Sequence, residues 1–317
     1  EMVNYFPPDF SQAAAISIVL LGISATGVWG QRVMLSRRSY VTVTGKTQTG
    51  KVRRGGWFGL IGFIVCGSYV ILIVAVPMIT LAVTSFMSYF TFESPKFTLS
   101  NYPFLFFEHP LTGRGIRNSL ILATVGATVT VLITAVIGYV ITKGRGRWRV
   151  ILDMLSMTPI AIPATAFAVA LLATWIRVPY LYGTLAILLI AYVTIYLPFG
   201  VRTANANLAQ IHDDLEAASR TSGASWSYTF RRIMFPLLRP GLIGAWILIF
   251  ISMLKEISAS ILLFTHGTEV MSVVLVEMWS EGSFPLAASM ALIQTVIVGL
   301  IILGFRWLTK ADLRSLT

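Results

Sequence analysis

The chain has 317 residues, of which 56% are hydrophobic and only 12% are charged. A soluble globular domain carries roughly twice that charged fraction, so the composition excludes an ordinary soluble protein and indicates lipid as the main solvent. The net charge is +11, but the basic residues form short clusters between apolar runs, without the aromatic-interleaved stripe typical of nucleic-acid binding. A lipid bilayer is therefore expected as a partner, and nucleic acid is not.

Seven apolar runs approach or exceed the roughly 20 residues that a helix needs to cross a bilayer. In chain order they cover residues 11–30, 58–88, 119–142, 151–176, 184–201, 241–264 and 284–305. The sequence predicts an all-α integral membrane protein with about seven transmembrane helices.

Two of these runs carry further signals. Small residues in the third run predict close helix packing. Pro159 and Pro163 in the fourth run each remove a backbone donor and predict a bend, serving either packing or function.

The distribution of Lys and Arg predicts the orientation. Nineteen of the 24 basic residues fall in one alternate set of loops and four in the other, with Lys255 inside a run. Cytoplasmic loops retain basic residues, so we expect a multi-pass protein of a bacterial inner membrane with a cytoplasmic C-terminus.

The hydrophilic loop 202–240 contains the strongest local pattern. Within it, apolar residues recur at helical spacing over residues 207–223, and Gly223 is a suitable helix terminator. The sequence predicts one short amphipathic helix there, which must pack against its own bundle or a partner. The alternative is an ordinary surface helix that caps the bundle.

The stretch EAASRTSGASWSYTFRRIMFP, residues 216–236, resembles the cytoplasmic signature loop of inner-membrane permeases in binding-protein-dependent ABC importers. Gly223 is followed ten positions later by Ile233 and then by Pro236, which is the spacing of that family, with Phe235 in place of its usual Leu. The family's Glu-Ala-Ala falls on residues 217–219, so Glu216 stands one residue early and its role stays open.

The resemblance implies a coupling helix that docks into a groove on a cytoplasmic ATPase subunit, one of two such subunits. It also implies an extracytoplasmic solute-binding protein as a partner. The residues that it assigns to the coupling loop are Leu215, Glu216, Ala217, Ala218, Ser219, Gly223, Ile233 and Pro236.

The resemblance also divides the chain. It implies a six-helix permease domain over residues 57–309 and a cytoplasmic tail over 310–317, and it leaves an extra helix in 1–30 and a basic linker in 31–56. The segment RRSYVTVTGK in that linker is similar to the connector of ferric-iron-type fused permeases. Our hypothesis is the C-terminal half of such a fused permease; the alternative is a separate subunit that pairs with a second copy.

Charged residues inside the sixth run are the candidates for the translocation pathway. Lys255 and Glu256 stand side by side, although each charge in a bilayer core costs about 2.5–3.5 kcal/mol. A similar Lys-Glu pair followed by small residues occurs in ferric-iron-type permeases. With Ser258 and Gln294 they are expected to line the pathway, or else to form structural ion pairs and hydrogen bonds.

No catalytic or cofactor site is expected. The three histidines lack metal-ligand spacing, and GKTQTGK lacks the spacing of a phosphate-binding loop, so ATP hydrolysis is assigned to separate subunits. We expect the permease of an ATP-driven importer for a small solute, with ferric iron as the best guess. The alternative is a secondary transporter driven by an ion gradient.

Overall fold

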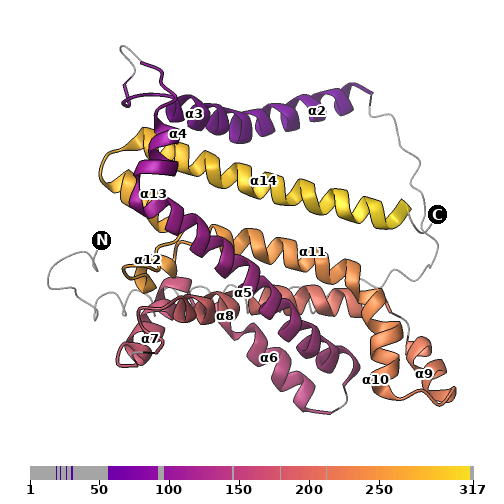
Figure 1. Ribbon diagram of the computed structural model, residues 1–317. Helices are drawn as coiled ribbons and strands as arrows, with labels where there is room; N and C mark the ends of the chain where they lie inside the picture. Colours follow the sequence, from indigo (N-terminus) through magenta and orange to yellow (C-terminus); the bar gives the residue numbers. More distant parts are fainter. Residues whose placement is uncertain are drawn as a thin grey trace.

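Figure 1 shows the computed structural model, which describes residues 56–91, 96–144, 146–178, 180–211 and 213–314, together with the single positions 19, 22, 26 and 30. The expected extra helix in 1–30 and the basic linker in 31–56 therefore lie almost entirely outside the described residues.

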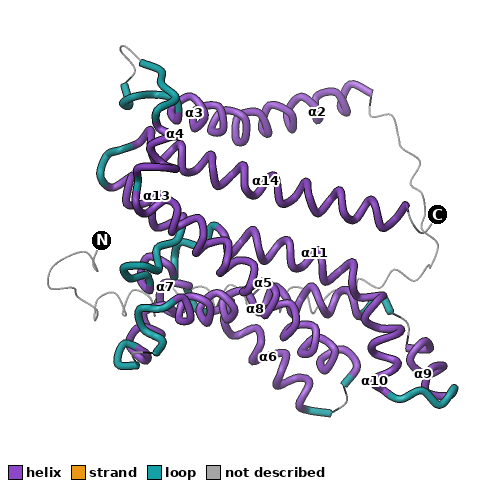
Figure 2. The backbone as a smooth tube through the Cα atoms, in the orientation of Figure 1, coloured by secondary structure: helices purple, strands orange, loops and turns teal. Residues whose placement is uncertain are grey.

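The described part of the chain is built from helices (Figure 2). Its α-helices are α2 (Gly56–Val70), α3 (Val76–Ser85), α4 (Asn101–Pro103), α5 (Pro110–Lys143), α6 (Trp148–Ala161), α7 (Ala164–Trp175), α8 (Leu185–Leu208), α9 (Asp213–Thr221), α10 (Trp226–Thr229), α11 (Phe235–Leu254), α12 (Ser260–Leu263), α13 (Met271–Ser280) and α14 (Phe284–Arg314). Three π-helical turns are η1 (Ile71–Ala75), η2 (Phe104–Glu108) and η3 (Phe230–Met234).

Among the described residues, five stretches are long and apolar enough to cross a membrane, and a bent helix pair makes a sixth. They are Gly59–Ser85, Pro110–Lys143, Leu185–Leu208, Ser227–Leu254, Phe284–Phe305 and the pair Trp148–Ala161 with Ala164–Trp175. The prediction of an all-α membrane protein is confirmed. Each expected span from the second to the seventh has a counterpart, although the sixth begins and ends earlier than predicted.

The fourth span is broken where the sequence places its prolines. α6 and α7 meet at 101°, and Ile162 between them has the extended conformation φ −99°, ψ 122°. A residue that precedes proline is driven out of the α region by the proline ring, so Pro163 ends α6 and starts α7. The expected bend is a break between two helices.

Three other prolines follow a widened helical turn; the helix continues at Pro77 and Pro236, whereas His109 before Pro110 is extended, with φ −77° and ψ 117°. Each π-helical turn ends two residues before a proline, at Pro77, Pro110 and Pro236. The residue between them donates its N–H to the carbonyl five positions back, as from Phe235 to Phe230. Proline has no N–H and collides with the carbonyl of the preceding turn, and a π turn accommodates both effects.

The core forms where α5, α7, α8 and α11 meet, and small residues bring these helices close together. A Cβ added at Gly138 in α5 would lie 2.7 Å from the Cβ of Ala204 in α8. A Cβ added at Gly126 would lie 2.7 Å from Sδ of Met253 in α11. The predicted close packing of the third span is confirmed.

The helices run between two ends of the bundle (Figure 1). At one end, on the right in the figure, lie the turn between α5 and α6, the segment with α9 and α10, and the last turns of α14. At the other end lie α4, α7, α12 and α13. The described loops that the sequence marks as basic, between α5 and α6 and between α8 and α11, thus lie at the α9 end. The chain remains helical to Arg314, well into the expected tail.

Candidate functional site

The segment between α8 and α11 is a helical hairpin at the α9 end of the bundle. α8 continues to Leu208, the chain turns at residues 209–211, and a separate helix runs from Asp213 to Thr221. The prediction of one amphipathic helix over residues 207–223 was therefore wrong. Leu208 is buried at the end of α8, so its helical spacing from Leu215 belongs to two different helices.

Gly223 sets the turn that follows α9. Its φ of +80° lies in the left-handed region, which costs an L side chain energy but not glycine. Beyond the turn, Oγ of Ser219 and Oγ1 of Thr229 form a buried hydrogen bond of 2.8 Å, and the N–H of Ala224 donates to the carbonyl of Ser219. The sequence assigned the helix stop correctly, and the hydrogen bonds fix α10 beside α9.

The face of α9 that the sequence marked as apolar is uncovered. Leu215 is 44% exposed, and Ala217 and Ala218 are also exposed. Beside them lies a cavity of about 710 Å³, which we call the α9–α10 groove; it is lined by Ser219, Ser222, Gly223, Ala224, Ser225, Tyr228 and Ile233. Three of the eight predicted coupling residues thus line one groove, and three more are exposed on the adjoining helix. Glu216 lies in α9, and Pro236 is exposed at the start of α11.

The base of this hairpin is anchored to the bundle. Leu208, Met234 and Leu238 form a buried cluster, against which the ring of Phe230 packs edge-on to that of Tyr139, with centroids 5.9 Å apart. Nζ of Lys143 at the end of α5 donates to the carbonyl of Ile211 at 3.1 Å. The hairpin is therefore attached to α5, α8 and α11 by packing and by a hydrogen bond.

The second group of predicted residues lies in a break of the helix. α11 ends at Leu254, and residues 255–259 form no helix before α12 begins. The prediction that the sixth span runs through residues 255–264 was wrong, and with it the premise that Lys255 and Glu256 project from one continuous helix. Ser258 is half-buried in the same break.

The carboxylate of Glu256 is held on both of its oxygens. The hydroxyl of Tyr196 in α8 donates to Oε2 at 2.6 Å, and the N–H of Ala259 donates to Oε1 at 3.1 Å. The backbone carbonyl of Glu256 accepts from the hydroxyls of Ser260 and Ser272. Glu256 thus caps the break instead of facing an open space.

Gln294 in α14 stabilises the same helix break, because its Nε2 donates a hydrogen bond to the carbonyl of Leu254 at 2.8 Å. This carbonyl is one of those that a helix end leaves without an intrahelical partner. In the same region the hydroxyls of Tyr192 and Ser260 lie 2.6 Å apart and are buried. Sequence reasoning missed Tyr192 and Tyr196, although two tyrosines four residues apart in an apolar span indicate a polar partner for one helix face.

Lys255 differs from its neighbour. It is exposed, and it forms no ion pair with any carboxylate in the described part of the chain. Close to it, a cavity of about 200 Å³ opens between the two long helices that carry Tyr196 and Ser252. We call it the α8–α11 groove; its lining is Tyr196, Phe199, Arg202, Thr203, Ala245, Leu248, Ile249 and Ser252.

A buried carboxylate fixes the loop at the opposite end of the bundle. Glu269 is 4% exposed. Its Oε2 lies 3.9 Å from Nη1 of Arg114, and its Oε1 lies 3.6 Å from Nδ1 of His266. Burial alone would raise the pKa of Glu269, but backbone N–H groups of Gly267 and Glu269 and the positive charges of Arg114 and His266 lower it below its usual range. The amide of Asn118 donates to the carbonyls of Gly267 and Glu269, so the loop is tied to α5.

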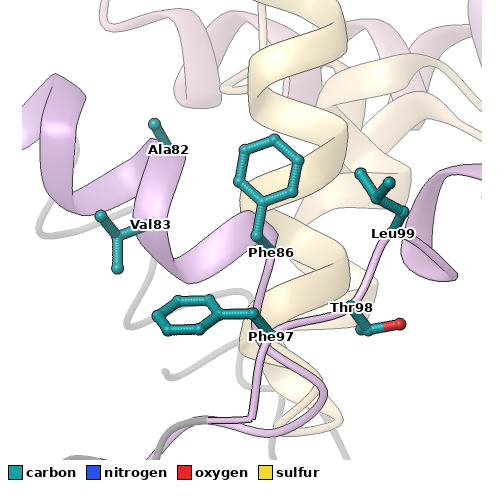
Figure 3. A pocket seen from close by; sticks show the side chains of 6 residues that line it. All are labelled: Ala82, Val83, Phe86, Phe97, Thr98 and Leu99. Atoms are coloured by element: carbon teal, nitrogen blue, oxygen red, sulfur yellow. The ribbon is translucent and has the colours of Figure 1, made fainter.

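A further cavity is mainly apolar. Figure 3 shows a cavity of about 570 Å³ beside the end of α3, with the rings of Phe86 and Phe97 as its largest walls and no titratable side chain among its lining residues. Within the described ranges, no three His, Cys, Asp or Glu side chains are placed to hold a metal ion.

Comparison with known proteins agrees with this architecture. The chain is 29% identical over 320 residues to the "Ferric transport system permease protein FbpB" of Actinobacillus pleuropneumoniae, covering 95% of this chain and 44% of that protein. It is 32% identical over 272 residues to the "Putative ferric transport system permease protein FbpB 1" of Haemophilus influenzae, covering 83% of this chain and 42% of that protein. The chain thus spans less than half the length of these relatives.

A solved structure has the same fold. It is described as a "bacterial ABC transporter involved in the import of the acidic polysaccharide alginate", and it matches with a TM-score of 0.66 at 18% identity, over 80% of this chain and 95% of that one. Residues 130–312, which include both grooves and the helix break, match the family "Binding-protein-dependent transport system inner membrane component". The chain belongs to this family of inner-membrane transport components.

Proposed function

We propose that this chain is the membrane permease component of an ATP-driven importer and that the hairpin of α9 and α10 receives a cytoplasmic ATPase subunit. The observation that carries the proposal is the uncovered face of α9 beside the α9–α10 groove. Small side chains at Ala217 and Ala218 permit close approach of a partner, and Gly223 turns the chain without a side chain in the way.

The anchoring of the hairpin supplies the means of coupling. Because Phe230, Met234 and Ile211 tie it to three long helices, movement of a docked ATPase would reach the bundle as a rigid-body rotation. In this proposal the permease is non-catalytic and ATP is hydrolysed by its partners. Two ATPase subunits, an extracytoplasmic solute-binding protein and a second permease domain complete the proposed assembly.

The proposal includes the domain division and the orientation. The permease domain covers residues 57–309 with its coupling loop at 202–240, after an extra helix in 1–30 and a linker in 31–56. The α9 end, which carries the described basic loops, is proposed to face the cytoplasm with the C-terminal tail. The second permease domain is either part of the same polypeptide or a second copy.

The proposed solute is ferric iron, on the strength of the names of the two relatives. A secondary transporter driven by an ion gradient, the alternative raised by the sequence, is not supported by membership in a binding-protein-dependent family. Uptake that persists when the proton gradient is collapsed and ATP is maintained is the expected result. Abolished uptake under those conditions would restore the alternative.

Gly223→Leu tests the coupling hairpin, and Gly146→Leu is its matched control. Both glycines have positive φ, +80° and +93°, and neither has an atom within 4 Å of an added Cβ. Both substitutions therefore impose similar backbone strain, and only the first obstructs the α9–α10 groove. We expect Gly223→Leu to abolish co-purification with the system's ATPase subunit and Gly146→Leu to retain it. Equal ATPase association in the two variants would refute the proposed docking.

A further inference from the structure

One positive charge lines the α8–α11 groove, and a second follows the end of α11, which forms one of its walls. Arg202 lines the groove near its α9 end. Lys255 is the first residue after α11 and follows Ser252, another lining residue, by three positions. Neither cation forms an ion pair with a carboxylate among the residues that the structure describes.

The neighbouring carboxylate forms no ion pair with Lys255. Glu256 is half-buried, and both of its oxygens already accept hydrogen bonds, from Tyr196 and from the N–H of Ala259. The ring of Tyr196, a lining residue, carries the hydroxyl that contacts the carboxylate, so the tyrosine lies between Glu256 and the groove. Arg202 in the groove and the exposed Lys255 beyond it are thus free of ion pairs with the described carboxylates, while the carboxylate of Glu256 is bonded to the tyrosine.

An unpaired ammonium inside a membrane span is costly unless it faces water or a polar solute. Lys255 is the first residue beyond an apolar helix of 20 residues, and its exposed ammonium is more stable beside water than in lipid. Hydroxyl groups of Tyr196, Thr203 and Ser252 follow the same wall and are suited to a hydrated passage.

From these observations we infer that the α8–α11 groove with Lys255 is a wall of the translocation pathway that favours small anions over cations. The inference rests on the proposed function as a permease, and it specifies the class of solute. An oxyanion and a ferric ion inside a negatively charged complex share the required property, a net negative charge on a small solute. A bare ferric ion would be repelled by Lys255 and Arg202.

Charged thiol reagents measure the field in the groove without knowledge of the solute. The full chain carries one cysteine, Cys66, which is replaced by serine before Ser252→Cys is introduced. The anionic sulfonatoethyl and the cationic trimethylammonioethyl methanethiosulfonates are then applied from either side of the membrane. For the thiol introduced at position 252, we expect the ratio of the anionic to the cationic reaction rate to exceed that ratio for a free thiol in solution by about tenfold. This factor is the lower range of electrostatic acceleration in a charged cleft.

Two further variants decide whether Lys255 is the cause. Lys255→Met should remove most of the preference and Lys255→Arg should keep it. Leu300→Cys on α14, 63% exposed in an apolar stretch, serves as a control for reaction at a lipid-facing position. Equal rates for the two reagents, a preference that Lys255→Met leaves unchanged, or a thiol at position 252 as unreactive as the one at position 300 would each overturn the inference.

Uptake distinguishes the two sources of negative charge. In the complete transporter, ferric citrate and molybdate serve as the anionic ferric complex and the oxyanion, and Mn²⁺ serves as the bare cation. A fall of at least about tenfold in the import of either anion in Lys255→Met supports the inference and identifies which kind of anion the groove favours. Import of Mn²⁺ that is unchanged by Lys255→Met overturns it. The proposed function fails separately, through equal ATPase association of Gly223→Leu and Gly146→Leu.

Discussion

The contact between α5 and α8 can be tested by adding one methyl group. In Gly138→Ala, the new Cβ would lie 2.7 Å from the Cβ of Ala204 and 3.1 Å from Oδ1 of Asn205. At the first distance a neighbour must move, and overpacking of this kind costs about 1–3 kcal/mol. Alanine recovers up to about 1 kcal/mol of helix propensity relative to glycine. The net expectation is a destabilisation of about 1–2 kcal/mol.

Gly299→Ala is the matched control, because Gly299 is also inside a long helix but has no atom within 4 Å of an added Cβ. It keeps the gain in helix propensity without the collision. Intrinsic tryptophan fluorescence of the detergent-solubilised protein during heating, at one scan rate, gives the comparison. Gly138→Ala should lower Tm by a few degrees and Gly299→Ala should raise it or leave it unchanged. Equal shifts of the same sign in both variants would refute the packing argument.

Two further predictions concern the carboxylates of Glu256 and Glu269, which both accept hydrogen bonds. Tyr196→Phe removes the hydroxyl that donates to Glu256 at 2.6 Å, and the loss of a hydrogen bond to a charged group should destabilise the protein by about 1.5–3 kcal/mol. The control Tyr180→Phe, at an 88% exposed position, should leave Tm unchanged. Similar Tm values for both variants would contradict the prediction. The pKa of Glu269 is lowered on folding. The contribution of its carboxylate to stability is therefore complete above the unfolded pKa of about 4.3 and is lost as pH falls through the lower folded pKa. Glu269→Gln should therefore reduce the fall of Tm below about pH 5, and parallel Tm profiles of wild type and variant would contradict this reasoning.

The sequence predicted those features that depend on local composition and on residue spacing. Apolar length is sufficient to place a spanning helix, because a bilayer leaves each backbone group to bond within its own segment. The stop at Gly223 and the bend at Pro163 were also predicted, since positive φ and a missing N–H act on neighbouring residues alone.

Other features depended on contacts between distant segments, which no local pattern contains. The helix break at residues 255–259 is stabilised by Tyr196 from α8 and Gln294 from α14, so the apolar run through residue 264 gave no sign of it. The separation of α8 from α9 likewise depends on the burial of Leu208 against Met234 and Leu238.

The sequence by itself determined the class of protein, its spans and its signature loop, because lipid solvation and chain turns are properties of single segments. Only the tertiary structure decided that the adjacent residues Lys255 and Glu256 have different surroundings. It bonds Glu256 to α8 and leaves Lys255 exposed beside a groove, because the partner that satisfies a buried charge comes from another helix.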